Sequence, residues 1–309
     1  MDSYNFLLSL ALILLFTKIF GLMTAHVHLP QVVGALLAGI IFGPSGVGLL
    51  HESDFLVKTA EIGVIMLMFI AGIDTDINEL KHTGPAACLI AVLGVFVPIV
   101  GCGGVYLLFF GAGADYQSLI KAAFVGVVFA ATSVSITVET LNEMGKLKTK
   151  VGTTILSAAI IDDIIGIVVL SILSALSDSS VNPGIISLKI LAFFVFTAIV
   201  GFIVYKIFKK ISINHGTSRR VAVWALAFCF IMSYCAERFF GVADITGAYF
   251  AGVILCNVTN SRQYVAKKVT AASYLLFSPV FFANIGLKTD LTGINTSIIL
   301  FAAVLAVMA

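Results

Sequence analysis

Apolar residues along this chain form long runs, and short polar joins separate the runs and carry most of the charge. A helix that crosses a bilayer needs roughly 20 predominantly apolar residues, and lipid offers no partner to an unpaired backbone group. The pattern therefore predicts membrane-spanning helices. The eleven predicted spans are 4–22, 30–50, 59–73, 85–110, 119–141, 151–176, 185–208, 219–236, 243–258, 269–286 and 294–309.

Composition supports an all-α integral membrane protein and excludes a water-soluble one. Of 309 residues, 60% are hydrophobic and only 11% are charged, whereas a soluble domain carries about 25% charged residues. A net charge of +2 gives no basis for a nucleic-acid partner. The five cysteines fall inside apolar runs without paired spacing, which favours small packing residues over a disulfide frame or a metal site, and no cofactor is expected.

The distribution of basic residues predicts the orientation. Of the 18 Lys and Arg, thirteen fall in the odd-numbered joins and five in the even-numbered joins. Because basic residues concentrate on the cytoplasmic side, we expect a multi-pass protein of the cell membrane with its N-terminus outside and its odd-numbered joins in the cytoplasm.

A weak internal repeat points to a class of membrane protein. Residues 31–42 (QVVGALLAGIIF) match 244–255 (DITGAYFAGVIL) 213 positions later, and 72–76 (GIDTD) matches 286–290 (GLKTD) 214 positions later. Seven spans separate the copies, so the copies cross in opposite directions. Inverted repeats are typical of secondary transporters, whose binding site lies at the midplane between the copies.

The repeat also predicts how the single membrane domain, 1–309, is divided. Its first repeat covers 1–176 and includes core helices within 85–176, the span 185–208 is a linker, and 219–309 is an incomplete second repeat. The fourth, fifth and sixth spans should each have a counterpart in the second repeat. Only part of the counterpart of the fourth span is present, so we expect about two and a half further helices after Ala309.

Two acidic residues lie in the middle of the sixth span. Asp162 and Asp163 sit within IIDDII, and no Lys or Arg lies within one helical turn. A charged side chain at the bilayer centre costs roughly 2.5–3.5 kcal/mol on insertion scales, so such residues are functional by default. Capping of a broken helix or pairing with a distant base are the structural alternatives, and the flanking isoleucines show no helix break.

Two buried carboxyl groups can support exchange by competition. Low-dielectric surroundings and a like-charged neighbour both disfavour the ionised form, so a proton is held near neutral pH and a cation can displace it. A site that takes either a proton or Na⁺, but not both well together, exchanges one for the other. Asp163 or Asp162 would bind the ion and the other would lie at its edge.

A hard cation also needs several neutral oxygens, and the fifth span offers candidates. Thr132, Ser133, Ser135 and Thr137 form a hydroxyl cluster within residues 124–141. Ser and Thr in membrane helices often bond to the carbonyl four residues earlier, which is the structural alternative. Four hydroxyls in six residues beside the carboxylate span favour a locally unwound segment whose carbonyls face a cavity.

These motifs resemble a known family. TSVSIT at 132–137 followed by AAIIDDIIG at 158–166 is similar to the cation:proton antiporter-2 family, especially its NapA-like and GerN-like sodium–proton exchangers. HLPQVVGALLAGIIFGPSGVGLL (28–50) and SPVFFANIGLKTDL (278–291) share the resemblance, which covers essentially the whole chain.

The resemblance implies an inverted-repeat antiporter fold of thirteen helices, about eleven of them present here, with a homodimer-forming panel domain and a mobile core. It implies that Asp163 binds the transported Na⁺ or K⁺, that Asp162 is its partner, and that Thr132 and Ser133 line the site. Paired aspartates imply electrogenic exchange, whereas the Kef-type potassium branch tends to carry Gln-Asp. A conserved Lys and a further acidic residue are expected beyond Ala309.

We therefore predict Na⁺/H⁺ exchange by alternating access, with K⁺/H⁺ exchange as the alternative. A sodium-coupled carrier of organic solutes, a passive channel, and an intramembrane aspartate-dependent enzyme (a prenyl transferase or aspartyl protease) are weaker alternatives. Glu139 and Glu143 close the fifth span on the cytoplasmic side, where a solvated helix end is favoured over a cation-attracting funnel.

Overall fold

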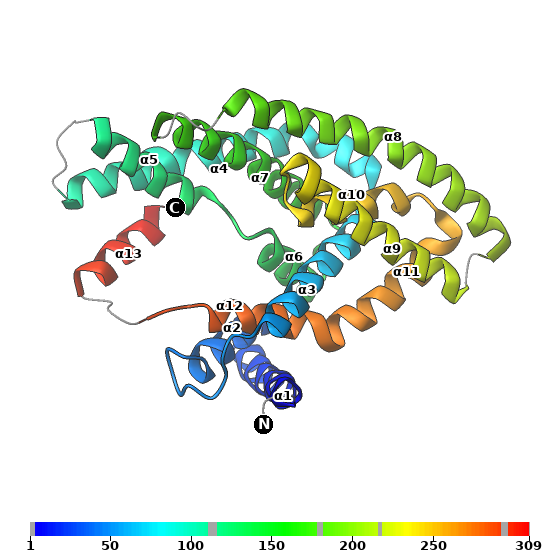
Figure 1. Cartoon of the computed structure of the whole chain (residues 1–309), viewed down its shortest axis with the longest axis horizontal. Helices are drawn as coiled ribbons and strands as arrows, with labels where there is room; N and C mark the ends of the chain where they lie inside the picture. The colour runs from blue at the N-terminus through cyan, green and yellow to red at the C-terminus, as the bar shows by residue number, and fades with distance from the viewer. Residues whose placement is uncertain (1–3, 111–115, 178–181, 216–217, 292–295, 309) are drawn as a thin grey trace.

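The computed structural model describes residues 4–110, 116–177, 182–215, 218–291 and 296–308, and these residues form helices and no strand. Figure 1 shows their arrangement. The elements are α1 (Asn5–His26), α2 (Gln31–Phe42), α3 (Asp54–Asp74), α4 (Ile77–Phe110), α5 (Tyr116–Ala130), α6 (Val134–Glu143), α7 (Lys150–Ser177), α8 (Pro183–His215), α9 (Arg219–Cys235), η1 (Ala236–Phe240), α10 (Asp244–Cys256), α11 (Thr259–Ala272), η2 (Ser273–Phe277), α12 (Ser278–Leu287) and α13 (Thr296–Met308), where η1 and η2 are π-helical turns.

Among the described residues, eight helical stretches are long and apolar enough to cross a membrane, and Gln31–Phe42, Asp244–Cys256 and Ser297–Val307 are shorter apolar helices. The predicted second span, 30–50, is too long. α2 ends at Phe42 because the GPSGVG segment that follows cannot continue it, and Gly48 has a φ of +70°. The eleven-span count stays a prediction, and part of the last span lies outside the described residues.

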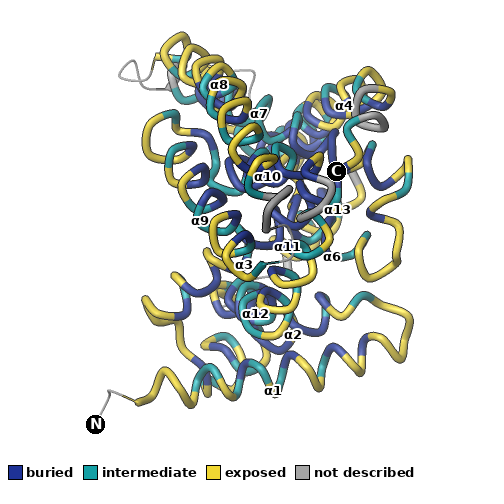
Figure 2. Tube along the Cα trace, turned by 90° about the vertical axis from the view of Figure 1, so that its right-hand side faces the viewer, coloured by how far each residue is buried: buried dark blue, intermediate teal, exposed yellow. Residues whose placement is uncertain are grey.

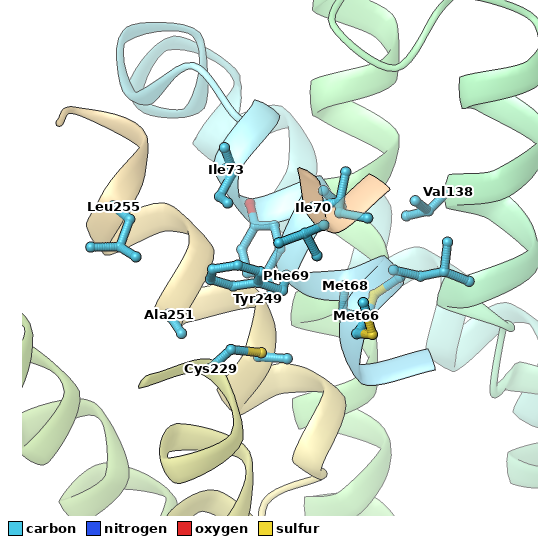
Figure 3. Packing of buried hydrophobic residues seen from close by; sticks show 14 of the residues in the cluster. Met66, Met68, Phe69, Ile70, Ile73, Val138, Cys229, Tyr249, Ala251 and Leu255 are labelled. Atoms are coloured by element: carbon cyan, nitrogen blue, oxygen red, sulfur yellow. The ribbon is translucent and has the colours of Figure 1, made fainter. Parts of the chain in front are cut away.

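Two groups of helices can be distinguished by their packing. In the first, α4, α5 and α7 lie together (Figure 1), with Ala87, Ala91 and Ala158 at the contact of α4 and α7. In the second, α10 crosses α3, and α12 crosses α2. The largest buried cluster lies in the second group, where Met66, Phe69 and Tyr249 surround the crossing of α3 and α10 (Figure 3).

Glycines let the helices of the second group touch backbone to backbone. A Cβ on Gly252 would lie 2.8 Å from the Cα of Gly72, and a Cβ on Gly39 would lie 2.9 Å from the Cα of Gly286. The predicted repeat relates Gly39 to Gly252 and Gly72 to Gly286. Each of the two contacts therefore joins a glycine of the first copy to a glycine of the second copy, and the repeat relates one contact to the other. This is the symmetry expected of an inverted-repeat antiporter fold.

Apolar side chains cover the outside of the molecule. Figure 2 shows exposed positions along the outer faces of α1, α8 and α9, and Val100, Leu108 and Leu275 are each at least 74% exposed. A surface of this kind is solvated by lipid chains, which agrees with a multi-pass membrane protein. All five cysteines are free: Cys102, Cys229 and Cys256 are buried, as expected of packing residues, whereas Cys88 is exposed.

Candidate ion-binding site

The site begins with a break in the fifth predicted span. α5 ends at Ala130, residues 131–133 are not helical, and α6 begins at Val134, so the predicted unwinding is confirmed. Figure 1 shows the extended segment between the two helices. The last carbonyls of α5 lack partners within the helix and carry the negative end of its dipole, which favours a cation at this point.

Both aspartates lie in the middle of α7. Asp162 is 8% exposed, and its Oδ1 is buried with no hydrogen-bond partner among the described residues. This oxygen faces α4 at Gly94, where a Cβ would lie 3.8 Å away. Thr132 and Asp162 line the same cavity, so the helix break and the carboxylate helix meet there.

A cavity of about 200 Å³ joins these elements. Thr132, Asp162 and Asp163 line it together with Ala130 and Ala131. The cavity therefore combines two carboxylates, one hydroxyl and a broken helix end, which is a suitable set of oxygens for a small monovalent cation. The remaining lining residues are apolar or glycine: Val95, Val127, Gly166, Ile167 and Leu170.

The other predicted hydroxyls play local roles. The Ser133 side chain caps α6 by accepting a hydrogen bond from the Ile136 N–H at 3.4 Å, and Ser135 is buried in the first turn of α6. The Thr137 hydroxyl donates to the Ser133 carbonyl at 3.0 Å, which is the structural alternative considered for this cluster. Of the predicted hydroxyls, only Thr132 lines the cavity with the carboxylates.

Sequence reasoning missed one residue at the site. Thr246, on the first turn of α10, donates from its Oγ1 to Asp163 Oδ2 at 3.4 Å. The internal repeat contains one sign of this residue. Position 33 of the first copy is Val, and the corresponding position 246 of the second copy is Thr, so the two copies differ there by a hydroxyl.

Comparisons with known proteins identify the family of the chain. A family model described as "Sodium/hydrogen exchanger, transmembrane" matches residues 8–309. The chain belongs to the sodium/hydrogen exchanger family. Members of this family are transporters, so the enzyme alternative is excluded, and they move ions without a cofactor.

Two relatives of this exchanger cover nearly all of it. It is 36% identical to the Na(+)/H(+)-K(+) antiporter GerN of Bacillus cereus, over 99% of this chain and 78% of the relative. It is 33% identical to the Na(+)/H(+) antiporter of Enterococcus hirae, over 97% of this chain and 77% of the relative. The fold matches the sodium proton antiporter MjNhaP1 from Methanocaldococcus jannaschii with a TM-score of 0.68 and 19% identity, over 94% of this chain and 72% of that one.

The exchanger also has a second, larger cavity of about 470 Å³, lined by Glu139, Glu143, Lys18 and Tyr274 among others. Glu139 is only 6% exposed and accepts a hydrogen bond from the Tyr274 hydroxyl at 2.8 Å, so its assignment to a solvated helix end is wrong. Glu143 is exposed, as predicted, and accepts from the Gln31 N–H at 2.7 Å. The prediction failed for Glu139 because Tyr274 and the helices of this cavity come from distant parts of the chain.

Proposed function

We propose that this exchanger moves Na⁺ in exchange for protons by alternating access, with Asp163 binding the ion and Asp162 as its partner. The observation that carries the proposal is the shared cavity of Thr132, Asp162 and Asp163 beside the helix break. The Oδ1 of Asp162, which has no hydrogen-bond partner among the described residues, supports it, because a bound proton or cation would offset the cost of burying this carboxylate.

The exchange follows from competition at these carboxylates. A bound Na⁺ or a bound proton neutralises the charge, and the neutral site can be carried past the apolar barrier. An ionised, empty site crosses far more slowly because desolvating a bare carboxylate is costly. The group of helices that includes α4, α5 and α7 is the proposed moving core, and the division of the chain at 176 and 219 is part of this proposal.

K⁺ is the second candidate cation. The name of GerN gives both Na⁺ and K⁺, and carboxylate and hydroxyl oxygens accept either ion. A Na⁺ preference would follow from a cavity that contracts around the smaller ion. Competition between the two cations for exchange in the same vesicles distinguishes these alternatives.

The assembly and orientation are further parts of the proposal. We infer a homodimer in the cell membrane, with the N-terminus outside and the odd-numbered joins in the cytoplasm, on the basis of the basic residues and the family resemblance. Single cysteines introduced at Lys146 and Thr289 should react with impermeant reagents from opposite sides. Electrogenic exchange, with more than one proton per cation, predicts that a membrane potential changes the rate.

The test of the proposal is cation-dependent proton movement in everted vesicles. Asp163→Asn should abolish exchange, and Asp162→Asn should weaken it strongly. Asp54→Asn is the matched control, since Asp54 is an exposed aspartate in the first turn of α3 and lies outside the cavity. Exchange at the normal rate by Asp163→Asn, in protein present at normal abundance, would remove the proposed carrier residue.

A further inference from the structure

We propose that Thr246 is a positioning residue that holds the empty, ionised Asp163 in place and so prevents the exchanger from moving without cargo. This inference rests on the proposed function, because it assumes that Asp163 carries the ion. It adds a role for a hydroxyl on α10, which lies outside the group formed by α4, α5 and α7.

The contact is partly buried and joins two helices, α10 and α7. Thr246 is 4% exposed, and its Oγ1 donates to Asp163 Oδ2 at 3.4 Å. No ion pair forms between Asp163 and a basic side chain of the described residues. The Tyr249 hydroxyl, one turn along α10, pairs instead with Thr75 Oγ1 of α3 at 3.2 Å. Thr246 is therefore the side-chain donor on this side of the carboxylate.

The Thr246 side of Asp163 has no room for a hydrated ion. The gap between Asp163, Thr246 and Tyr249 has a volume of only about 10 Å³, and its other lining residues are apolar: Met68, Val134, Ile160 and Ile245. Such a gap holds about one water molecule at most and has no room for a hydrated cation. Cargo must approach from the cavity of about 200 Å³ on the Thr132 side. In this arrangement Thr246 hydrogen-bonds the Asp163 carboxylate and does not bind the ion, and the ion reaches Asp163 from the Thr132 side.

α10 is firmly attached to the second group of helices. Gly252 lies against Gly72 of α3, and a Cβ on Gly247 would lie 2.5 Å from the Met232 carbonyl of α9. The hydrogen bond from Thr246 to Asp163 therefore joins the two helix groups. Any movement of α7 relative to α10 along the membrane normal must break it.

The charge of Asp163 decides how strongly this bond resists movement. A hydroxyl donates more strongly to an ionised carboxylate than to a neutral acceptor, by roughly a factor of two in energy. When a proton or a cation neutralises Asp163, the bond weakens and the two groups can separate. The same bond therefore holds the empty exchanger and releases the loaded one.

The test compares Thr246→Val, which keeps the shape and removes the donor, with Thr246→Ser, which keeps the donor. In proteoliposomes, we would measure Na⁺/H⁺ exchange and also net Na⁺ flux driven by a membrane potential with protons held low and equal on both sides. Thr246→Val should raise this uncoupled Na⁺ flux about tenfold relative to exchange, since a hydrogen bond to a charged group is lost. Thr246→Ser should stay near the unmodified protein.

Each outcome has a distinct meaning. A Thr246→Val protein with unchanged uncoupled flux, or a Thr246→Ser protein that leaks as much as Thr246→Val, overturns the proposal for Thr246. Normal exchange by Asp163→Asn in the same assay overturns the proposed function instead. If Thr246→Val does not fold, Thr246→Ala also lacks the donor, adds no bulk, and carries the same comparison with Thr246→Ser.

Discussion

Gly72 and Gly252 meet where α3 crosses α10, and a Cβ on Gly252 would lie 2.3 Å from the Phe69 carbonyl. A backbone atom cannot move aside as a flexible side chain can. We therefore expect Gly252→Ala to destabilise the protein by about 1–3 kcal/mol, the usual effect of overpacking. The measurement is the melting temperature in detergent.

Gly104→Ala is the matched control for this substitution, because Gly104 also lies in an apolar helix and a Cβ there would meet no atom within 4 Å. Its melting temperature should be unchanged or slightly higher. Equal melting temperatures for the two variants would contradict the close approach of α3 and α10.

Substitutions at Thr132 and Thr137 test whether a hydroxyl of the 132–137 cluster binds the ion or only bonds to a nearby backbone carbonyl. The Thr132 hydroxyl donates weakly to the Ala130 carbonyl at 3.4 Å, and Thr132 lines the cavity with the aspartates, whereas the Thr137 hydroxyl donates to the carbonyl of Ser133, the residue before α6, and Thr137 does not line that cavity. Thr132→Val should raise the apparent KM for Na⁺ about fivefold, because one polar ligand is lost. Thr137→Val should leave that KM nearly unchanged. If the substitution at Thr137 raised the KM more than the substitution at Thr132, the ion would bind beside Thr137, and the proposed site beside Thr132 would be wrong.

Tyr274 stabilises a buried acid. Its hydroxyl donates to Glu139 at 2.8 Å and accepts from the Asn142 side chain at 2.6 Å. Tyr274→Phe leaves the Glu139 carboxylate buried without this donor, which should cost about 1–3 kcal/mol of stability. In a Glu139→Gln background the same substitution should cost clearly less. Equal costs in the two backgrounds, measured as a double-mutant cycle, would show that the two groups are not coupled.

The ion pair between Lys148 and Asp74 should matter little for stability. The atoms are 2.9 Å apart, and the Asp74 side chain is only 15% exposed, but the Lys148 side chain is 67% exposed, so water and salt reach the pair from the Lys148 side. Exposed pairs contribute less than about 1 kcal/mol and are screened by salt. Lys148→Gln should therefore lower the melting temperature slightly at low salt and not at high salt. A large decrease that persists at high salt would indicate that Lys148 does more than form this pair.

The sequence predicted features that depend on local composition. Asp162 and Asp163 stand out because ionisable residues are rare in apolar spans, and the break at 131–133 lies within an unusual hydroxyl cluster. It did not predict Thr246, since one hydroxyl in an apolar helix resembles many others and its partner lies 83 residues away. The burial of Glu139 was missed for the same reason, because its partner Tyr274 is 135 residues distant.

Thr132 and Thr246, which lie beside the aspartates of α7, are synthesised at different times relative to α7. Thr132 precedes Asp162 and Asp163 in the chain, so the helix break has already left the ribosome when the two acids enter the bilayer. Thr246 follows Asp163 by 83 residues, roughly 4 to 17 seconds of translation at ordinary elongation rates. The nascent α7 therefore enters lipid with its acids shielded only by protons and by the earlier half of the chain.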